Sequence, residues 1–166
     1  MPNEETTGTT GTTGTETNGT TTGTTTGTTT TGTGATSVIN LALEWVINTI
    51  NAMGNFATMT RGALGSANGL VCEVAPSNPE TVFLDKNWYA PIVVVINGKH
   101  TNLLTLTDCL NNIMDTLSRR TSYGSGTGWK IVDITNTVYP RVIGREENNA
   151  WVMACEITVK IERKDA

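Results

Sequence analysis

The first 36 residues constrain the fold of the chain more than any other feature of its sequence. From Thr6 to Thr36 there are 20 Thr and 8 Gly among 31 residues, and no Leu, Ile, Val or aromatic residue occurs before Val38. A segment without apolar side chains cannot offset the cost of ordering its backbone, about 1–2 kcal/mol per residue. We therefore predict a disordered Thr/Gly-rich arm over residues 1–36 and one folded domain over residues 37–166.

The composition of the predicted domain argues against several classes of partner. The chain has a net charge of −4, but three acidic residues lie in the arm, which leaves 12 acidic and 11 basic residues in the domain. A nearly neutral domain lacks a basic surface, so we expect no direct, stable nucleic-acid binding. No apolar run approaches 18 residues and no apolar segment follows Met1. We therefore expect neither a membrane span nor a cleaved secretion signal.

No catalytic or metal-binding pattern stands out in the sequence. Cys72, Cys109 and Cys155 are far apart and lack CxxC spacing, which predicts reduced, buried thiols. The single histidine, His100, has no carboxylate near it in sequence and is interpreted as a surface residue. Residues 97–101 lack the upstream glycine of a phosphate-binding loop. We therefore predict a protein that is not an enzyme, with no catalytic, cofactor-binding or metal-binding residues.

Two segments have the apolar spacing of helices. In residues 37–53, which Ser37 or the residue before it can cap, the polar side chains form one narrow stripe and nearly all others are apolar. That apolar arc is wider than one small sheet covers, so a second contact surface is expected on this helix. The second helix is predicted to be capped by Thr105 and to end at Arg119 and Arg120, with apolar residues at i, i+3, i+4 and i+7.

Three strands are predicted before the second helix. Residues 69–75 form a short apolar run that ends at Pro76, and residues 92–96 are a continuous β-branched run. The pair Asn97-Gly98 follows directly and is the typical sequence of a two-residue hairpin turn. The returning strand is therefore placed at residues 99–104, and residues 54–68 are interpreted as a loop.

Two further strands are predicted after a glycine-rich loop at residues 123–128. Val132, Ile134 and Val138 are expected to share one face of the first strand. In residues 151–162 every second residue from Trp151 is apolar or Cys, which predicts a half-buried antiparallel strand. The predicted fold class is α+β, with two helices packed on a mainly antiparallel sheet in the order α-β-β-β-α-β-β.

The domain has many large aromatic residues for a core of its size. Aromatic side chains and arginine are enriched at protein interfaces, although an ordinary core position is an equally good interpretation of each residue. The candidate subunit-interface residues are Trp45, Arg119, Arg120, Tyr123, Trp129, Tyr139 and Arg141.

Three segments together resemble a known family. They are the apolar first helix, residues 90–120 as a hairpin followed by a helix, and residues 138–163 as a closing hairpin. In their order and character they are similar to the tail terminator and minor capsid (head–tail joining) proteins of long-tailed bacteriophages. The resemblance covers residues 38–163 and does not include the Thr/Gly arm.

The resemblance implies a structural virion protein without a cofactor or catalytic activity. Tail terminators form a ring, usually of six copies, that closes the growing end of the tail tube and meets the head connector. The implied partners are other copies of the chain, the tail tube protein and the connector proteins, and the implied location is the tail or neck of a virion assembled in the host cytoplasm. Three alternatives remain: another phage neck or minor capsid protein, a surface-exposed binding module on a Thr/Gly stalk, and an enzyme whose pocket has no recognisable motif.

Removal of the arm should leave the stability of the domain unchanged, because the arm has no apolar side chain to add to the core. A shortened chain that begins at Thr36 is expected to melt within about 2 °C of the full chain, a shift that corresponds to well under 1 kcal/mol. Calorimetry of both chains tests this. A large fall in melting temperature on truncation would show that the arm packs on the domain.

Overall fold

The computed structural model describes residues 37–77, 81–82 and 88–163. The predicted disorder of residues 1–36 lies outside these residues. Residues Ala35–Ala166 form one compact unit. Its elements along the chain are α1 (Val38–Asn51), β1 (Met59–Arg61), β2 (Gly69–Ala75), β3 (Thr81–Val82), β4 (Trp88–His100), α2 (Leu103–Ser118), β5 (Ser125–Gly126), β6 (Trp129–Arg145) and β7 (Trp151–Arg163).

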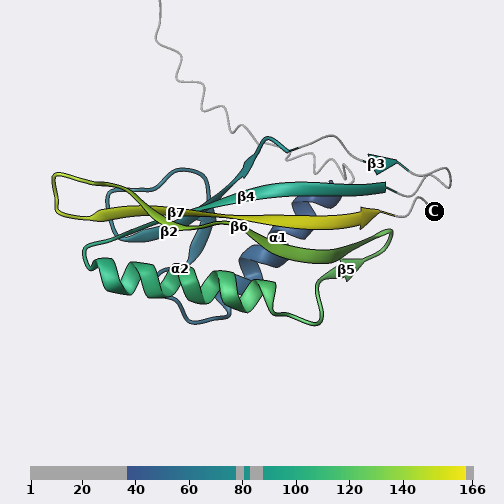
Figure 1. The fold of residues 1–166 in the computed structure, drawn as a ribbon, viewed down its shortest axis with the longest axis horizontal. Coiled ribbons are helices and arrows are strands. Elements are labelled where there is room, and N and C mark those ends of the chain that lie inside the picture. Colours follow the sequence, from purple (N-terminus) through teal and green to yellow (C-terminus); the bar gives the residue numbers. More distant parts are fainter. Residues whose placement is uncertain (1–36, 78–80, 83–87, 164–166) are drawn as a thin grey trace, which may run out of the picture. The chain divides into compact units, whose positions relative to one another are not determined.

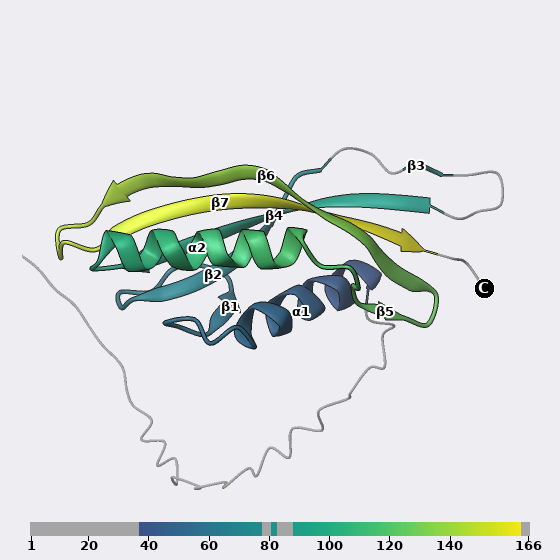
Figure 2. The ribbon, with the colours of Figure 1, turned by 60° about the horizontal axis from the view of Figure 1, so that its bottom comes forward.

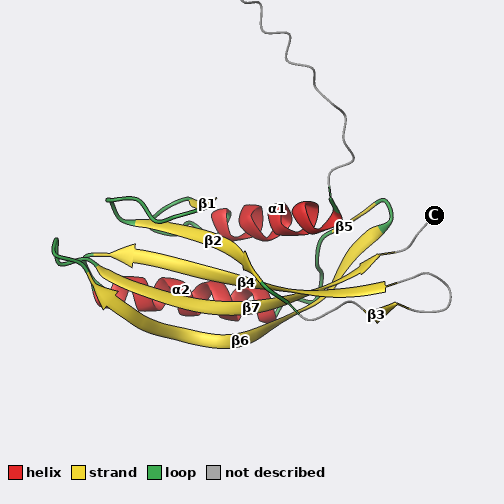
Figure 3. Ribbon diagram, turned by 90° about the horizontal axis from the view of Figure 1, so that it is seen from above, coloured by secondary structure: helices red, strands yellow, loops and turns green. Residues whose placement is uncertain are grey.

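The strands form one sheet in the order β1-β2-β4-β7-β6-β5, with β3 paired to the start of β4. The β1–β2 pair is parallel and all other pairs are antiparallel. Both helices lie on the same side of the sheet (Figures 1 and 2), and Figure 3 shows β6 and β7 passing across α2. The core lies between that side of the sheet and the two helices. The predicted fold class, two helices on a mainly antiparallel sheet, is confirmed.

Helix α2 begins earlier than predicted, because Asn102 rather than Thr105 caps it. The Asn102 side-chain Oδ1 accepts hydrogen bonds from the backbone N–H groups of Leu104 at 2.9 Å and Thr105 at 3.2 Å. These bonds satisfy two of the amides that a helix start leaves without partners. The strand predicted over residues 99–104 is therefore wrong, since residues 99–100 end β4 and residues 102–104 cap and begin the helix.

The hairpin predicted at Asn97-Gly98 is also wrong, because both residues lie inside β4. Gly98 pairs with Leu70 of β2 on one side and with Met153 of β7 on the other. A Cβ atom at this position would lie 2.6 Å from Cδ1 of Leu106 in α2. Glycine at position 98 therefore lets the helix approach the sheet closely and has no role in a turn.

Strand β6 does not alternate regularly. Its pairing with β7 shifts between Ile131 and Asp133, and Val132 is the extra residue at this bulge. As a result Ile131 and Ile134 are both buried, whereas Val132 is 39% exposed. The prediction that Val132, Ile134 and Val138 share one face is therefore wrong, because a bulge changes which side of the sheet each later residue points to.

Two short strands lie in segments predicted as loops. The β1 strand (Met59–Arg61) falls within residues 54–68 and pairs in parallel with the start of β2. The β5 strand (Ser125–Gly126) falls within residues 123–128 and pairs with the first two residues of β6. Both are too short to show a periodic pattern in the sequence.

Strand β7 follows the predicted alternation and lies between β4 and β6 in the sheet. Its core-facing side chains from Met153 onward are at most 3% exposed: Met153, Cys155, Ile157, Val159 and Ile161. On the opposite face Thr158 is partly exposed, and its hydroxyl is 2.6 Å from that of Thr137 in β6. The strand therefore places its apolar side chains under the helices and its polar ones on the side of the sheet without helices.

Charge placed on the two faces of β7 should have different effects on stability. Ile157→Asp would bury a carboxylate without a partner and is expected to lower the free energy of unfolding by about 4 kcal/mol or more. Thr158→Asp loses one hydroxyl hydrogen bond and should cost about 1 kcal/mol. Urea unfolding of both variants measures the difference. Equal losses would show that both faces of the strand are covered.

Candidate functional site

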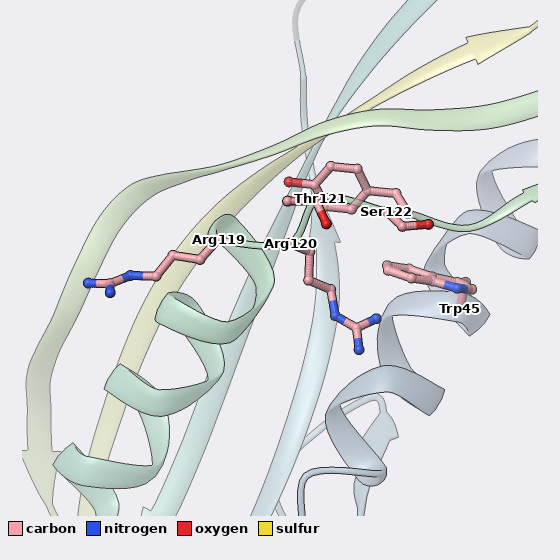
Figure 4. A pocket seen from close by; sticks show the side chains of 6 residues that line it. Trp45, Arg119, Arg120, Thr121 and Ser122 are labelled. Carbon is pink, nitrogen blue, oxygen red and sulfur yellow. The ribbon is translucent and has the colours of Figure 1, made fainter.

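A pocket of about 490 Å³ lies where α2 ends, beside the middle of α1. We call it the Trp45 pocket; it is lined by Trp45, Arg119, Arg120, Thr121, Ser122 and Tyr123. Trp45 comes from α1, and the other residues follow the last turn of α2 (Figure 4). The pocket therefore joins two elements that are more than 70 positions apart in the sequence.

The Trp45 ring is the centre of the pocket. The Arg120 guanidinium carbon lies 5.5 Å from its centroid, a cation–π arrangement. The Tyr123 ring lies 6.2 Å from the Trp45 ring at an interplanar angle of 71°, which is an edge-to-face contact. Figure 4 shows the Arg120 side chain extending toward Trp45 and the Arg119 side chain pointing away from it. Two aromatic rings and one cation thus lie in contact in this pocket.

Gly124 allows the indole to take this position. A Cβ atom on Gly124 would lie 2.5 Å from Cγ and Cδ1 of Trp45, so any larger residue must displace the ring. The Gly124 carbonyl accepts a hydrogen bond of 2.8 Å from the amide of Ile131. The start of β6 therefore holds this glycine against Trp45.

The two arginines of the pocket have different partners. Arg119 lies 3.7 Å from the Asp115 carboxylate, and both side chains are largely exposed, so this pair adds little stability. Among the described residues no carboxylate forms an ion pair with Arg120. A guanidinium stacked on an indole can bind a carboxylate and leave the aromatic rings for an apolar neighbour. Surfaces of this composition are typical of the centres of protein interfaces.

The structure brings four of the seven predicted interface residues together and separates the other three. Trp45, Arg119, Arg120 and Tyr123 line the pocket. Trp129 is half-buried against the core and Gly126. Tyr139 (69% exposed) and Arg141 (exposed) lie on the outer part of β6.

Of a second group of exposed apolar side chains, which lies on β6, the sequence indicated only Tyr139. Four of the six large apolar side chains that are exposed in the described part of the chain belong to this strand. We call them the β6 apolar surface; they are Val132, Tyr139, Val142 and Ile143. The surplus apolar surface had been predicted on α1, but every apolar side chain of that helix is buried or half-buried. The bulges of β6 hide this surface from a search based on regular alternation.

The free edge of β6 is poorly suited to adding another strand. Only its first two residues pair with β5, and its pairing with β7 is irregular at four places. Pro140 also removes one backbone donor in this region. Bulges and proline are devices by which natural sheets prevent edge-to-edge pairing. The β6 apolar surface is therefore suited to contacts through its side chains.

Lys99 is a buried cation that the sequence analysis did not single out. Its side chain is 2% exposed, and its Nζ lies 3.1 and 3.2 Å from the two carboxylate oxygens of Glu146. The same Nζ donates a hydrogen bond to the Gly65 carbonyl. A buried ammonium needs such partners to offset its lost hydration. Lys99 therefore ties the loop before β2 to the turn between β6 and β7.

The remaining candidates for chemistry have structural partners. The amide of Asn102 donates a hydrogen bond of 2.9 Å to Nδ1 of His100, whose ring packs edge-on against Phe56. Burial raises the pKa of the Cys155 thiol to about 12 and also raises the pKa of Cys72 and Cys109. At neutral pH all three are therefore protonated thiols, which are weak nucleophiles and weak metal ligands.

The described residues contain no group of three or more His, Cys, Asp or Glu side chains placed to hold a metal ion. No helix in the same part of the chain has the length and apolar character needed to cross a membrane. Comparison of the sequence with protein-family models and with curated proteins gives no match.

The contact between Gly124 and Trp45 predicts a specific effect of adding one methyl group. Gly124→Ala should displace the indole and lower the free energy of unfolding by about 1–3 kcal/mol. Gly144→Ala is the matched control, since no atom lies within 4 Å of its Cβ position. Urea unfolding followed by tryptophan fluorescence measures both. Equal stability of the two variants would mean that the ring does not occupy this position in solution.

Proposed function

We propose that the chain is a structural virion protein of a long-tailed bacteriophage, a tail terminator that forms a ring, caps the tail tube and meets the head connector. The observation that carries this proposal is the concentration of exposed apolar side chains on β6. Exposed large apolar side chains gathered on one strand of a small domain are typical of an association site. The resemblance of residues 38–163 to tail terminator and minor capsid proteins supports the identity of the partners.

Two further features support an assembly role. The Trp45 pocket combines aromatic rings with an arginine that has no carboxylate partner among the described residues. The pocket lies just after the C-terminal end of α2. Val142 and Ile143 lie near the C-terminal end of β6. A subunit in a ring needs two different surfaces, one for each neighbour. The Trp45 pocket and the β6 apolar surface are two such different surfaces.

The proposal predicts where the protein binds on a tail. Full-length protein added to assembled tail tubes of the cognate phage should appear at one end only in negative-stain images. Tyr139→Asp places a charge in the β6 apolar surface and should weaken this binding about tenfold or more. Thr135→Asp, at an exposed polar position of the same strand, is the matched control.

Other outcomes of this experiment exclude the terminator function. Binding along the tube wall, or no binding to tubes, would contradict it. A head-side minor capsid function would then become the better hypothesis, and binding to isolated connectors would test it.

A further inference from the structure

Several charged side chains have no ion-pair partner among the described residues, and two of them, of opposite sign, lie beside apolar or aromatic side chains. One is Arg120, whose guanidinium lies over the Trp45 ring. The other is Glu147, which is exposed in the turn between β6 and β7. Two residues before that turn, β6 carries the exposed side chains of Val142 and Ile143, which are 47% and 56% exposed. Each end of the domain therefore presents one such charge beside apolar or aromatic side chains.

The two charges lie at opposite ends of α2. Arg145, just before the turn, pairs with Trp151, and Trp151 pairs with His100, three residues before the helix begins. Arg120 follows the end of the helix. The 16 residues of α2 span about 24 Å, and Figure 2 shows the β6–β7 turn at the end of α2 farthest from β5. Within one copy of the domain the turn and the Trp45 pocket are therefore too far apart to meet.

The β6–β7 turn (residues 146–150) is a well-defined projection. The Glu146 amide donates to the Ala150 carbonyl at 2.8 Å, and the Asn149 amide donates to the Glu146 carbonyl at 2.9 Å. The Glu146 carboxylate is held by the buried ammonium of Lys99. Docking of a turn that is already ordered loses little conformational entropy.

Resting on the assembly role proposed above, we infer that this turn docks into the Trp45 pocket of a second copy of the chain. Glu147 of one copy pairs with Arg120 of the next copy, and Ile143 packs against the aromatic rings of Trp45 and Tyr123. The contact pairs an exposed anion with a cation, neither of which has an ion-pair partner among the described residues of its own copy, and it covers apolar side chains on both sides. The pocket's volume of about 490 Å³ is within the range of about 300–1,000 Å³ that is typical of ligand-binding pockets.

This contact is head-to-tail, because each copy contributes a different surface to each of its neighbours. Repetition of such a contact produces a closed ring when the rotation between copies permits closure. A symmetric contact between two identical surfaces would instead stop at a dimer. Single substitutions can distinguish the head-to-tail contact from the symmetric one.

Charge reversal tests the proposed ion pair. In sedimentation velocity at protein concentrations up to about 1 mM, where millimolar contacts are detected, the full chain should self-associate. Arg120→Glu and Glu147→Arg should each weaken association about tenfold or more, and the double variant should regain most of it. Asp108→Arg changes an exposed acid on α2 outside both surfaces and should leave association unchanged.

A mixing experiment tests the head-to-tail geometry. Arg120→Glu weakens the pocket side of the contact, and Ile143→Asp weakens the turn side; both side chains are exposed, so both variants should keep the wild-type melting temperature. An equimolar mixture retains one competent pocket and one competent turn surface. The mixture should therefore form dimers and nothing larger.

Three results would overturn the inference: no self-association of the full chain, association that survives Arg120→Glu, or a mixture that grows beyond dimers. None of them bears on attachment to tail tubes. A chain that binds one end of a tube but fails these tests would leave the proposed function intact. A chain that self-associates as expected but does not bind the end of a tail tube would support the inferred contact and contradict the terminator function.

Discussion

The pairing of β4 with β7 is the interaction on which the rest of the domain depends. These two strands are joined without a register shift over 13 residues, from Trp88 opposite Arg163 to His100 opposite Trp151. Their alternating side chains place one apolar face under both helices. Strand β2 extends this pair on one side and the irregular β6 on the other. Because the pair ends at His100, it also determines where α2 begins and, through the helix length, where the Trp45 pocket lies.

The elements that could be predicted from sequence are those with a regular local pattern. The strict alternation of β7 and the apolar run of β2, which ends before Pro76, predicted both strands correctly. The errors arose where a distant residue decides the conformation. Gly98 has the sequence of a turn, but its missing side chain is required by Leu106 of α2. In β6 the facing of Val132 depends on a bulge that only pairing with β7 reveals.

In the candidate site, too, residue types could be predicted from the sequence, but their arrangement depends on distant contacts. Trp45, Arg120 and Tyr123 could be selected by residue type, since aromatic residues and arginine are common at interfaces. Their meeting in one pocket could not be predicted, because it depends on how α1 and the end of α2 pack on the same face of the sheet. The burial of Lys99 had no local signal at all, because its carboxylate partner, Glu146, lies 47 positions further along the chain.

The ammonium group of Lys99 has a mechanical consequence. It holds the Glu146 carboxylate with one set of hydrogen bonds and the Gly65 carbonyl with another. The loop at residues 62–68 has no strand pairing of its own beyond the contacts at its two ends. A force applied to the β6–β7 turn is therefore transmitted through a single charged group to this loop. Because Lys99 also belongs to the central strand β4, displacement of the turn would be passed both to this loop and to the middle of the sheet.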